Sequence, residues 1–157
     1  MLLKDSKIPE GGIIRVIDSK NITGGGGFAF NFTDLSKQIY DECKVGQEGP
    51  HYRAVTKGIN ICGVCKFERC IAFNEEIVVP LNNIWRFDLI KKRENLKCPA
   101  CKGLFEPKTV AFFLCYYKIK GKNFENGKVK NFEFNGKSDR TDSLHYYDPL
   151  KWKNFSH

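Results

Sequence analysis

The sequence lacks any apolar stretch long enough to cross a membrane. Its 157 residues contain no run close to the roughly 18 apolar residues that a spanning helix needs. The first residues, Met1–Lys7, also lack the apolar core of about 7–15 residues found in a secretory signal peptide. We therefore expect no membrane contact and a cytoplasmic protein, with the nucleus as a second location, because cysteines stay reduced in both.

The motifs of common hydrolases and nucleotide-binding enzymes are also missing. The chain has no His-Glu-x-x-His, no Gly-x-Ser-x-Gly and no complete phosphate-binding loop. Four glycines, Gly24–Gly27, lead into Phe28 rather than into a Lys-Ser/Thr pair, which favours a hinge or linker. Seven cysteines at these spacings do not supply the two interleaved zinc sites of a RING-type ubiquitin ligase. We expect a protein that is not an enzyme.

The composition is that of a folded domain with an excess of positive charge. Hydrophobic residues make up 41% of the chain and aromatic residues 13%, enough for one domain of ordinary size with its own core. The formal net charge of +8 favours acidic or polyanionic partners. Many of the lysines are dispersed, so charge alone does not separate a binding surface from a solvated face.

Period-two patterns and turn signals predict a mainly β fold with a small α contribution, built as an antiparallel sheet around a zinc-ribbon-like four-cysteine site. Asn126-Gly127 is a type I′ hairpin signal between two such patterns. The apolar run within 108–120 predicts a central strand with both faces covered, in which Cys115 is a buried free thiol. Further strands are predicted at 11–18, 28–32, 51–57, 71–81, 85–90 and 144–147.

The sequence also predicts one short helix, how some of the strands are arranged, and the domain boundaries. Thr33 or Asp34 caps a short helix that runs towards Cys43. The strands at 71–81 and 85–90 form one hairpin, and the segment 144–147 closes the sheet as an edge strand. Residues 1–23 form an N-terminal extension that carries a strand, and residues 24–157 form a single zinc-stabilised β domain.

Five of the seven cysteines lie between positions 58 and 101, in two clusters. The spacing of Cys98-Pro-Ala-Cys101 allows both thiolates to bind one Zn²⁺ ion, at about 2.3 Å from each sulfur. The first cluster supplies the other half of a tetrahedral site, either as Cys62-x2-Cys65 or as Cys65-x4-Cys70. With 27 residues between Cys70 and Cys98, this is the layout of a zinc ribbon with one surplus cysteine.

Other interpretations of the cysteines are less favoured. Cys98 and Cys101 have the spacing of a redox dithiol, but such motifs usually open a helix, whereas Lys-Gly-Leu-Phe-Glu-Pro follows here. An odd number of cysteines argues against a disulfide framework. His51 and His145 are weaker candidate ligands, because a single histidine in an aromatic strand is more often a hydrogen-bonded packing residue.

Short motifs throughout the chain are shared with one family. They are Gly26-Gly27-Phe28-Ala-Phe30, Tyr52-Arg53, Gly58-Ile-Asn60, Cys65-x4-Cys70-Ile-Ala-Phe-Asn74, Phe87-Asp88, Cys98-Pro-Ala-Cys101 and Cys115-Tyr-Tyr-Lys-Ile-Lys-Gly121. With them, the stretch from about Gly25 to Trp152 resembles a zinc-binding cysteine domain of protists that is often encoded directly after ubiquitin-like repeats. The resemblance implies Cys65, Cys70, Cys98 and Cys101 as the ligands, because such relatives usually lack a cysteine at the position of Cys62, which stays the alternative ligand. The chain departs from this pattern before Gly24, where 23 residues leave no room for a ubiquitin fold.

Two functions follow as expectations. The first is a zinc-binding protein that contacts a protein partner or serves as a structural subunit of a larger assembly, with a link to ubiquitin implied by the resemblance. Its exposed candidates are the loop 66–69 and the aromatic segment around Trp152. The alternative is a nucleic-acid-binding zinc ribbon, in which Lys91, Lys92 and Arg93 and the region 118–130 contact the polyanion.

Overall fold

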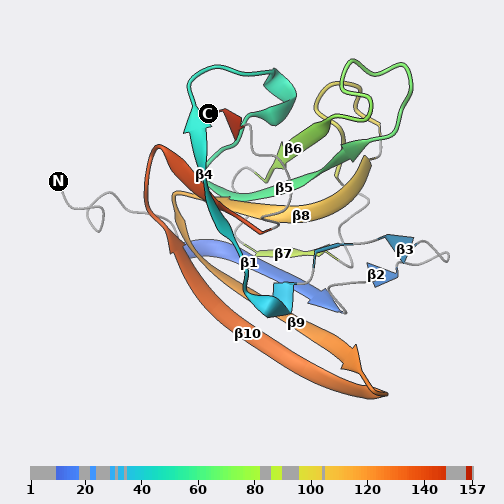
Figure 1. Cartoon of the computed structure of the whole chain (residues 1–157), viewed down its shortest axis with the longest axis vertical. Coiled ribbons are helices and arrows are strands. Elements are labelled where there is room, and N and C mark those ends of the chain that lie inside the picture. Colours follow the sequence, from blue (N-terminus) through green and yellow to red (C-terminus); the bar gives the residue numbers. More distant parts are fainter. Residues whose placement is uncertain are drawn as a thin grey trace.

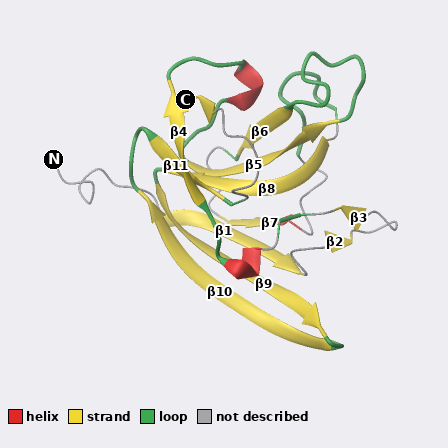
Figure 2. Cartoon of the chain, in the orientation of Figure 1, coloured by secondary structure: helices red, strands yellow, loops and turns green. Residues whose placement is uncertain are grey.

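Two curved β-sheets, packed on one another, form most of the protein (Figures 1 and 2). The computed structural model describes residues 10–17, 22–23, 29–30, 32–33, 35–81, 86–89, 96–103, 105–147 and 155–156. None of the helical segments in these residues is long and apolar enough to span a membrane. The strands confirm a mainly β fold: β1 (Glu10–Ile17), β2 (Ile22–Thr23), β3 (Ala29–Phe30), β4 (Asp41–Gly46), β5 (Gly58–Cys65), β6 (Glu76–Pro80), β7 (Arg86–Asp88), β8 (Phe105–Phe113), β9 (Cys115–Glu125), β10 (Lys128–Ser138), β11 (Ser143–Tyr146) and β12 (Phe155–Ser156).

The larger sheet has the strand order β12-β4-β11-β8-β5-β6, and the predicted central strand is β8. β8 pairs antiparallel with β5 on one side and with β11 on the other. Its residues alternate between two cores, because Val110 and Phe112 belong to one buried cluster and Ala111 and Phe113 to the other. The prediction of a strand covered on both faces is therefore confirmed.

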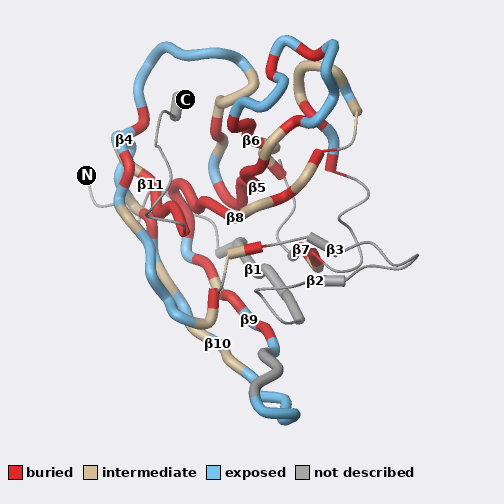
Figure 3. Tube along the Cα trace, turned by 45° about the vertical axis from the view of Figure 1, so that its right-hand side comes forward, coloured by how far each residue is buried: buried red, intermediate tan, exposed pale blue. Residues whose placement is uncertain are grey.

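The first core lies between the two sheets, and it contains part of the cysteine cluster. Ile59 and Ile61 of β5 pack there with Tyr117 and Ile119 of β9, and all four are buried. Figure 3 shows buried stretches on β8 and β9. Cys65, Cys70 and Cys98 belong to the same buried cluster. The cysteines thus lie where the inter-sheet core ends, rather than in a separate appended module.

The smaller sheet has the order β10-β9-β1-β7. β9 and β10 form the predicted hairpin, and its turn residues Asn126 and Gly127 have φ angles of 50° and 74°, as a type I′ turn requires. β1 runs parallel to both of its neighbours, with Ile14 in register with Phe87 of β7 and Ile119 of β9. The division between residues 23 and 24 stays a prediction, although β1, which precedes it, is hydrogen-bonded within this sheet.

The chain passes from one sheet to the other at Leu114. The sequence predicted one strand over 108–120, but Leu114 adopts a φ of 49° and separates β8 from β9. A left-handed residue interrupts the extended ladder and turns the chain through a corner. Cys115, immediately after the corner, is buried with a free thiol, as predicted.

The prediction of a helix between Asp34 and Cys43 is wrong. Leu35–Lys37 form one 3₁₀ turn, after which the chain becomes strand β4. Cys43 and Val45 are buried while the residues between and beside them are exposed, which is the period of a strand. Ile39, four residues after the buried Leu35, is 54% exposed, so the two side chains do not form one buried helix face.

Three predicted strand assignments also need correction. The segment 51–57 begins as a 3₁₀ turn, His51–Arg53, in which Arg53 donates hydrogen bonds to the Glu76 carbonyl and the Glu75 carboxylate. The hairpin predicted from 71–81 and 85–90 does not form, because β6 pairs with β5 while β7 pairs with β1 in the other sheet. β11 is an interior strand between β4 and β8, not an edge. The glycines 24–27 and Trp152 lie outside the described residues.

Candidate metal centre

Four cysteine sulfurs converge at one end of the inter-sheet core. The Sγ atoms of Cys65, Cys70, Cys98 and Cys101 all lie within 4.8 Å of one another. The Sγ atoms of Cys65 and Cys101 are 3.7 Å apart, and those of Cys70 and Cys98 are 3.8 Å apart. A tetrahedral ion with metal–sulfur bonds of about 2.3 Å needs sulfurs about 3.8 Å apart, so the group fits a four-thiolate metal site.

These distances exclude a disulfide arrangement. A disulfide requires sulfurs about 2.05 Å apart, and all four cysteines are free. Three of them are buried and Cys101 is partly buried, so the group is largely closed to water. A site with four protein sulfurs has no open coordination position for a substrate, which is typical of structural rather than catalytic metal centres.

The first two cysteines are brought together by the end of a strand and the turn that follows. Cys65 is the last residue of β5, and the Cys65 carbonyl accepts a hydrogen bond of 2.9 Å from the Asn74 backbone N–H. Within this loop the backbone N–H of Cys70 donates to the Phe67 carbonyl at 2.9 Å. Residues 65–74 therefore form a closed loop that returns Cys70 beside Cys65.

The other two cysteines lie on one tight turn. The Cys98 N–H donates to the Gly103 carbonyl, and the Lys102 N–H donates to the Cys98 carbonyl, both at 2.8 Å. Lys102 has a φ of 62°, which turns the chain back after Cys101. This compact turn is what the two-residue spacing predicts, because only a tightly wound backbone directs both sulfurs to one side.

Three of the four sulfurs accept a hydrogen bond from the backbone N–H two residues later. Ala72 donates to Cys70 at 3.3 Å, and Ala100 and Gly103 donate to Cys98 and Cys101 at 3.4 Å. At Cys65 the Phe67 N–H acts to lower the thiol pKa. Because an N–H donor stabilises negative charge on sulfur, the repeated arrangement favours thiolates and therefore metal ligation.

Burial raises the pKa of a thiol and so opposes the stabilisation of thiolates by the N–H donors when no cation is bound. Removal from water raises the pKa of Cys65 to about 12, although the Phe67 N–H counteracts it. Burial likewise raises the pKa of Cys70. At Cys101 burial also acts upwards, but the Gly103 N–H and the neighbouring cysteines outweigh it and lower the pKa. Four sulfurs this close to one another cannot all carry a negative charge without a cation, so a bound metal would resolve the conflict.

Cys62, the alternative fourth ligand, lies apart from this group. Cys62 and Cys65 both belong to the continuous strand β5, and residues three apart on a strand point to opposite faces. Cys62 is accordingly in the second core, with Cys43 and Val78, whereas Cys65 is in the first. Burial, with smaller effects of Glu76 and Cys43, raises the pKa of Cys62, as expected for a neutral packing thiol.

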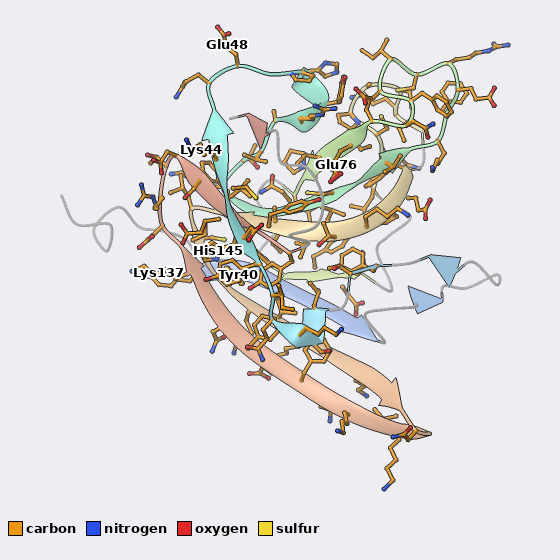
Figure 4. All side chains as sticks on the ribbon, in the orientation of Figure 1. Tyr40, Lys44, Glu48, Glu76, Lys137 and His145 are labelled. Carbon is orange, nitrogen blue, oxygen red and sulfur yellow. The ribbon has the colours of Figure 1, made fainter. Side chains whose placement is uncertain are left out.

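The two histidines considered as ligands are not part of the cysteine group. His51 is exposed, and His145 is buried on β11, where the Tyr40 ring stacks on it with ring centroids 4.1 Å apart (Figure 4). The Tyr117 hydroxyl forms a 2.8 Å hydrogen bond with His145 Nδ1 and a 2.7 Å bond with the Tyr147 hydroxyl. Burial lowers the pKa of His145, which is consistent with a neutral ring in a packed network.

Two further predictions concern the surroundings of the site. Lys91, Lys92 and Arg93, the predicted polyanion contacts, lie outside the described residues. The loop 66–69 is exposed, as predicted, but the exposed large apolar side chains on it and directly after it were not predicted. Phe67, Ile71 and Phe73 are 51%, 74% and 37% exposed. For Phe67 the available signal was its position inside Cys65-x4-Cys70, where no strand was predicted. Ile71 and Phe73 were assigned to the predicted strand 71–81, but β6 begins only at Glu76.

Comparisons with known proteins found no relative of this chain. No protein-family model matches the chain, and neither the curated proteins nor the solved structures contain a match. The fold and the site together define a mainly β protein in which four cysteines, contributed by two loops, form a group that could hold a metal ion.

Proposed function

We propose that the protein binds one structural Zn²⁺ ion through Cys65, Cys70, Cys98 and Cys101 and acts by contact with a protein partner rather than by catalysis. The observation that carries the metal proposal is the pair of sulfur–sulfur distances, 3.7 and 3.8 Å, which equal the edges expected for a zinc tetrathiolate. Four sulfur ligands in tetrahedral geometry favour zinc or an iron centre over magnesium, calcium or manganese, which prefer oxygen. Zinc is the simplest occupant, because it needs no redox partner.

We expect the zinc affinity to fall steeply as the pH falls. The metal binds thiolates, so binding must displace the protons of thiols such as Cys65 and Cys70, whose pKa values are raised by burial. If at least two protons leave on binding, lowering the pH by one unit weakens binding by about 100-fold or more. Competition with a chromophoric chelator between about pH 6.5 and pH 7.5 measures this dependence. A flat profile would contradict a thiolate site.

The partner surface we propose is the apolar knuckle, defined as Phe67, Ile71 and Phe73. These side chains lie on the loop that the first two cysteines close, so the metal would hold them in fixed positions. Ile71 is the most exposed large hydrophobic side chain described, at 74%. Exposed apolar side chains gathered on a rigid loop are typical of protein–protein contacts, because burying them against an apolar partner surface removes them from water.

The resemblance to a domain that follows ubiquitin-like repeats makes ubiquitin the first partner to test. We expect amide resonances of residues 66–75 to shift saturably when ubiquitin is added to ¹⁵N-labelled zinc-loaded protein. The triple change Phe67→Ser, Ile71→Ser and Phe73→Ser should abolish these shifts. The control pair Ile39→Ser and Val129→Ser changes side chains of comparable exposure elsewhere, at 54% and 52%, and should leave them intact.

If ubiquitin gives no shifts, the link to ubiquitin is rejected. The apolar knuckle is then tested by affinity purification from the native organism with the same variants. Proteins retained by the control pair but lost by the triple variant would identify the partner. If the wild type, the control pair and the triple variant all recover the same proteins equally well, the apolar knuckle is rejected as the contact surface.

A further inference from the structure

A second surface, on the β9–β10 hairpin, carries a regular row of lysines. Cross-strand neighbours of an antiparallel pair share one face, and Lys118, Lys120 and Lys122 lie opposite Asn135, Glu133 and Asn131. The alternate residues of β9, among them Tyr117 and Ile119, are buried in the first core. We call the outward side the lysine face: Tyr116, Lys118, Lys120 and Lys122 of β9, and Asn131, Glu133, Asn135 and Lys137 of β10.

The hairpin that carries the lysine face is more basic than the rest of the chain. Residues 115–138 contain six lysines and two glutamates, a net charge of +4, which is half of the +8 carried by all 157 residues. On the lysine face a single carboxylate serves two lysines, since Glu133 lies 3.6 Å from Lys118 and 3.9 Å from Lys120. Lys122 makes no ion pair with any residue that the structure describes.

The fold itself does not account for the lysine row. Lysines often protect the free edge of a sheet from aggregation, but β9 is an interior strand between β10 and β1. Lysine is disfavoured in strands, and side chains two residues apart on one face of a strand lie only about 6.8 Å apart. Three ammonium groups in one row therefore repel one another, and a bound polyanion would relieve that repulsion.

We propose that the lysine face binds double-stranded nucleic acid through its phosphate backbone. A two-stranded β-ribbon fits the major groove of a duplex. β9 and β10 form such a ribbon beyond Lys122, where β1 ends, and the lysine row lies on the adjoining part of the sheet (Figure 1). By the strand register, the row of positive charges runs from Lys137, opposite Tyr116, to Lys122, opposite Asn131. This surface is separate from the cysteine group, so the proposal does not rest on the proposed zinc site or on the apolar knuckle.

The side chains on the lysine face favour a duplex over a single strand. Proteins that bind single strands stack successive bases on several exposed aromatic rings. Tyr116 is the one aromatic side chain that the described residues place on this face, and Lys137 Nζ already lies 5.4 Å from its ring centroid. Lysines and asparagines instead donate hydrogen bonds to phosphate oxygens, which fixes a protein on a duplex without reading many bases.

The test compares two variants of the same net charge in the full-length, zinc-loaded protein. Lys118→Gln, Lys120→Gln and Lys122→Gln together remove the lysine row. Lys37→Gln, Lys44→Gln and Lys57→Gln remove three exposed lysines elsewhere and form the matched control. Fluorescence anisotropy with a 20-base-pair DNA duplex, the equivalent RNA duplex and a single strand gives affinities over a salt series, and zinc content with circular dichroism verifies folding.

We expect the lysine-row variant to bind at least one of the two duplexes, DNA or RNA, at least about 10-fold more weakly than the control variant does. The slope of log affinity against log salt should be smaller by about 2.7, which corresponds to three lost phosphate contacts on a B-form DNA duplex. Equal losses in the two variants, or a preference for the single strand, would overturn the proposal. Equally tight binding to poly-glutamate or to phosphatidylserine vesicles would also overturn it, because the surface would then select charge and not a duplex.

Discussion

Cys98→Ser should leave the protein unfolded or with a midpoint of thermal unfolding far below that of the wild type. Cys98 is fully buried, its sulfur lies 3.8 Å from that of Cys70, and its backbone closes the turn that carries Cys101. A structural zinc site contributes on the order of 10 kcal/mol to folding, comparable with the whole stability of a small domain. Loss of one ligand sulfur would therefore remove most of the net stability.

The matched substitution is Cys62→Ser, which changes an equally buried cysteine of the neighbouring strand. Here we expect a loss of about 1–3 kcal/mol, because a hydroxyl replaces a thiol in an apolar core without disturbing the cysteine group. Thermal unfolding and zinc stoichiometry should be measured for both proteins. Zinc content should stay at one per chain in Cys62→Ser and fall in Cys98→Ser. Equal damage by the two substitutions would contradict the assignment of the ligands.

Gly63→Ala should destabilise the protein by more than about 3 kcal/mol, at the upper end of the cost of overpacking. A Cβ atom at Gly63 would lie 2.2 Å from the Glu106 backbone oxygen and 2.6 Å from the Phe105 ring. The register of β5 against β8 shifts between Cys62 and Gly63, so the two backbones approach each other closely at this point. The backbone oxygen cannot move aside as a side chain could.

Gly127→Ala is the control for this substitution. Gly127 has a φ of 74°, but no atom lies within 4 Å of the position of an added Cβ. The substitution should therefore cost only the conformational strain of a left-handed alanine, about 1–2 kcal/mol. Urea unfolding of both variants measures the difference. The outcome that contradicts the steric argument is a Gly63→Ala protein no less stable than Gly127→Ala.

The cysteine group was predictable to the extent that local spacing determines it. Two residues between Cys98 and Cys101 predict a tight turn, and the structure has that turn. Spacing alone left both Cys62 and Cys70 possible as the cysteine that completes the ligand set. The resemblance to the protist domain favoured Cys70. What excludes Cys62 from the group is the continuation of β5 to Cys65, and the pattern of the sequence did not show where that strand ends.

Tertiary pairing was less predictable than strand position. The apolar patterns of β6 and β7 were identified, but nothing in them indicates that the chain between them leaves one sheet and enters the other. Similarly, Leu35 and Ile39 have helical spacing, whereas pairing of Cys43 with Leu144 of β11 selects a strand for the segment that follows. Contacts between residues about 100 positions apart outweigh local propensity at such places.

The parallel position of β1 between β7 and β9 has a consequence for synthesis of the chain. β1 is made first among the described strands, but its partners begin at Arg86 and Cys115. One edge of β1 therefore stays without its native strand until Arg86–Asp88 is made, and the other until β9 follows from Cys115 onwards. Delayed pairing of this kind slows folding and leaves a nascent β-segment open to aggregation. The smaller sheet can therefore be completed only after residues 115–138 have been made.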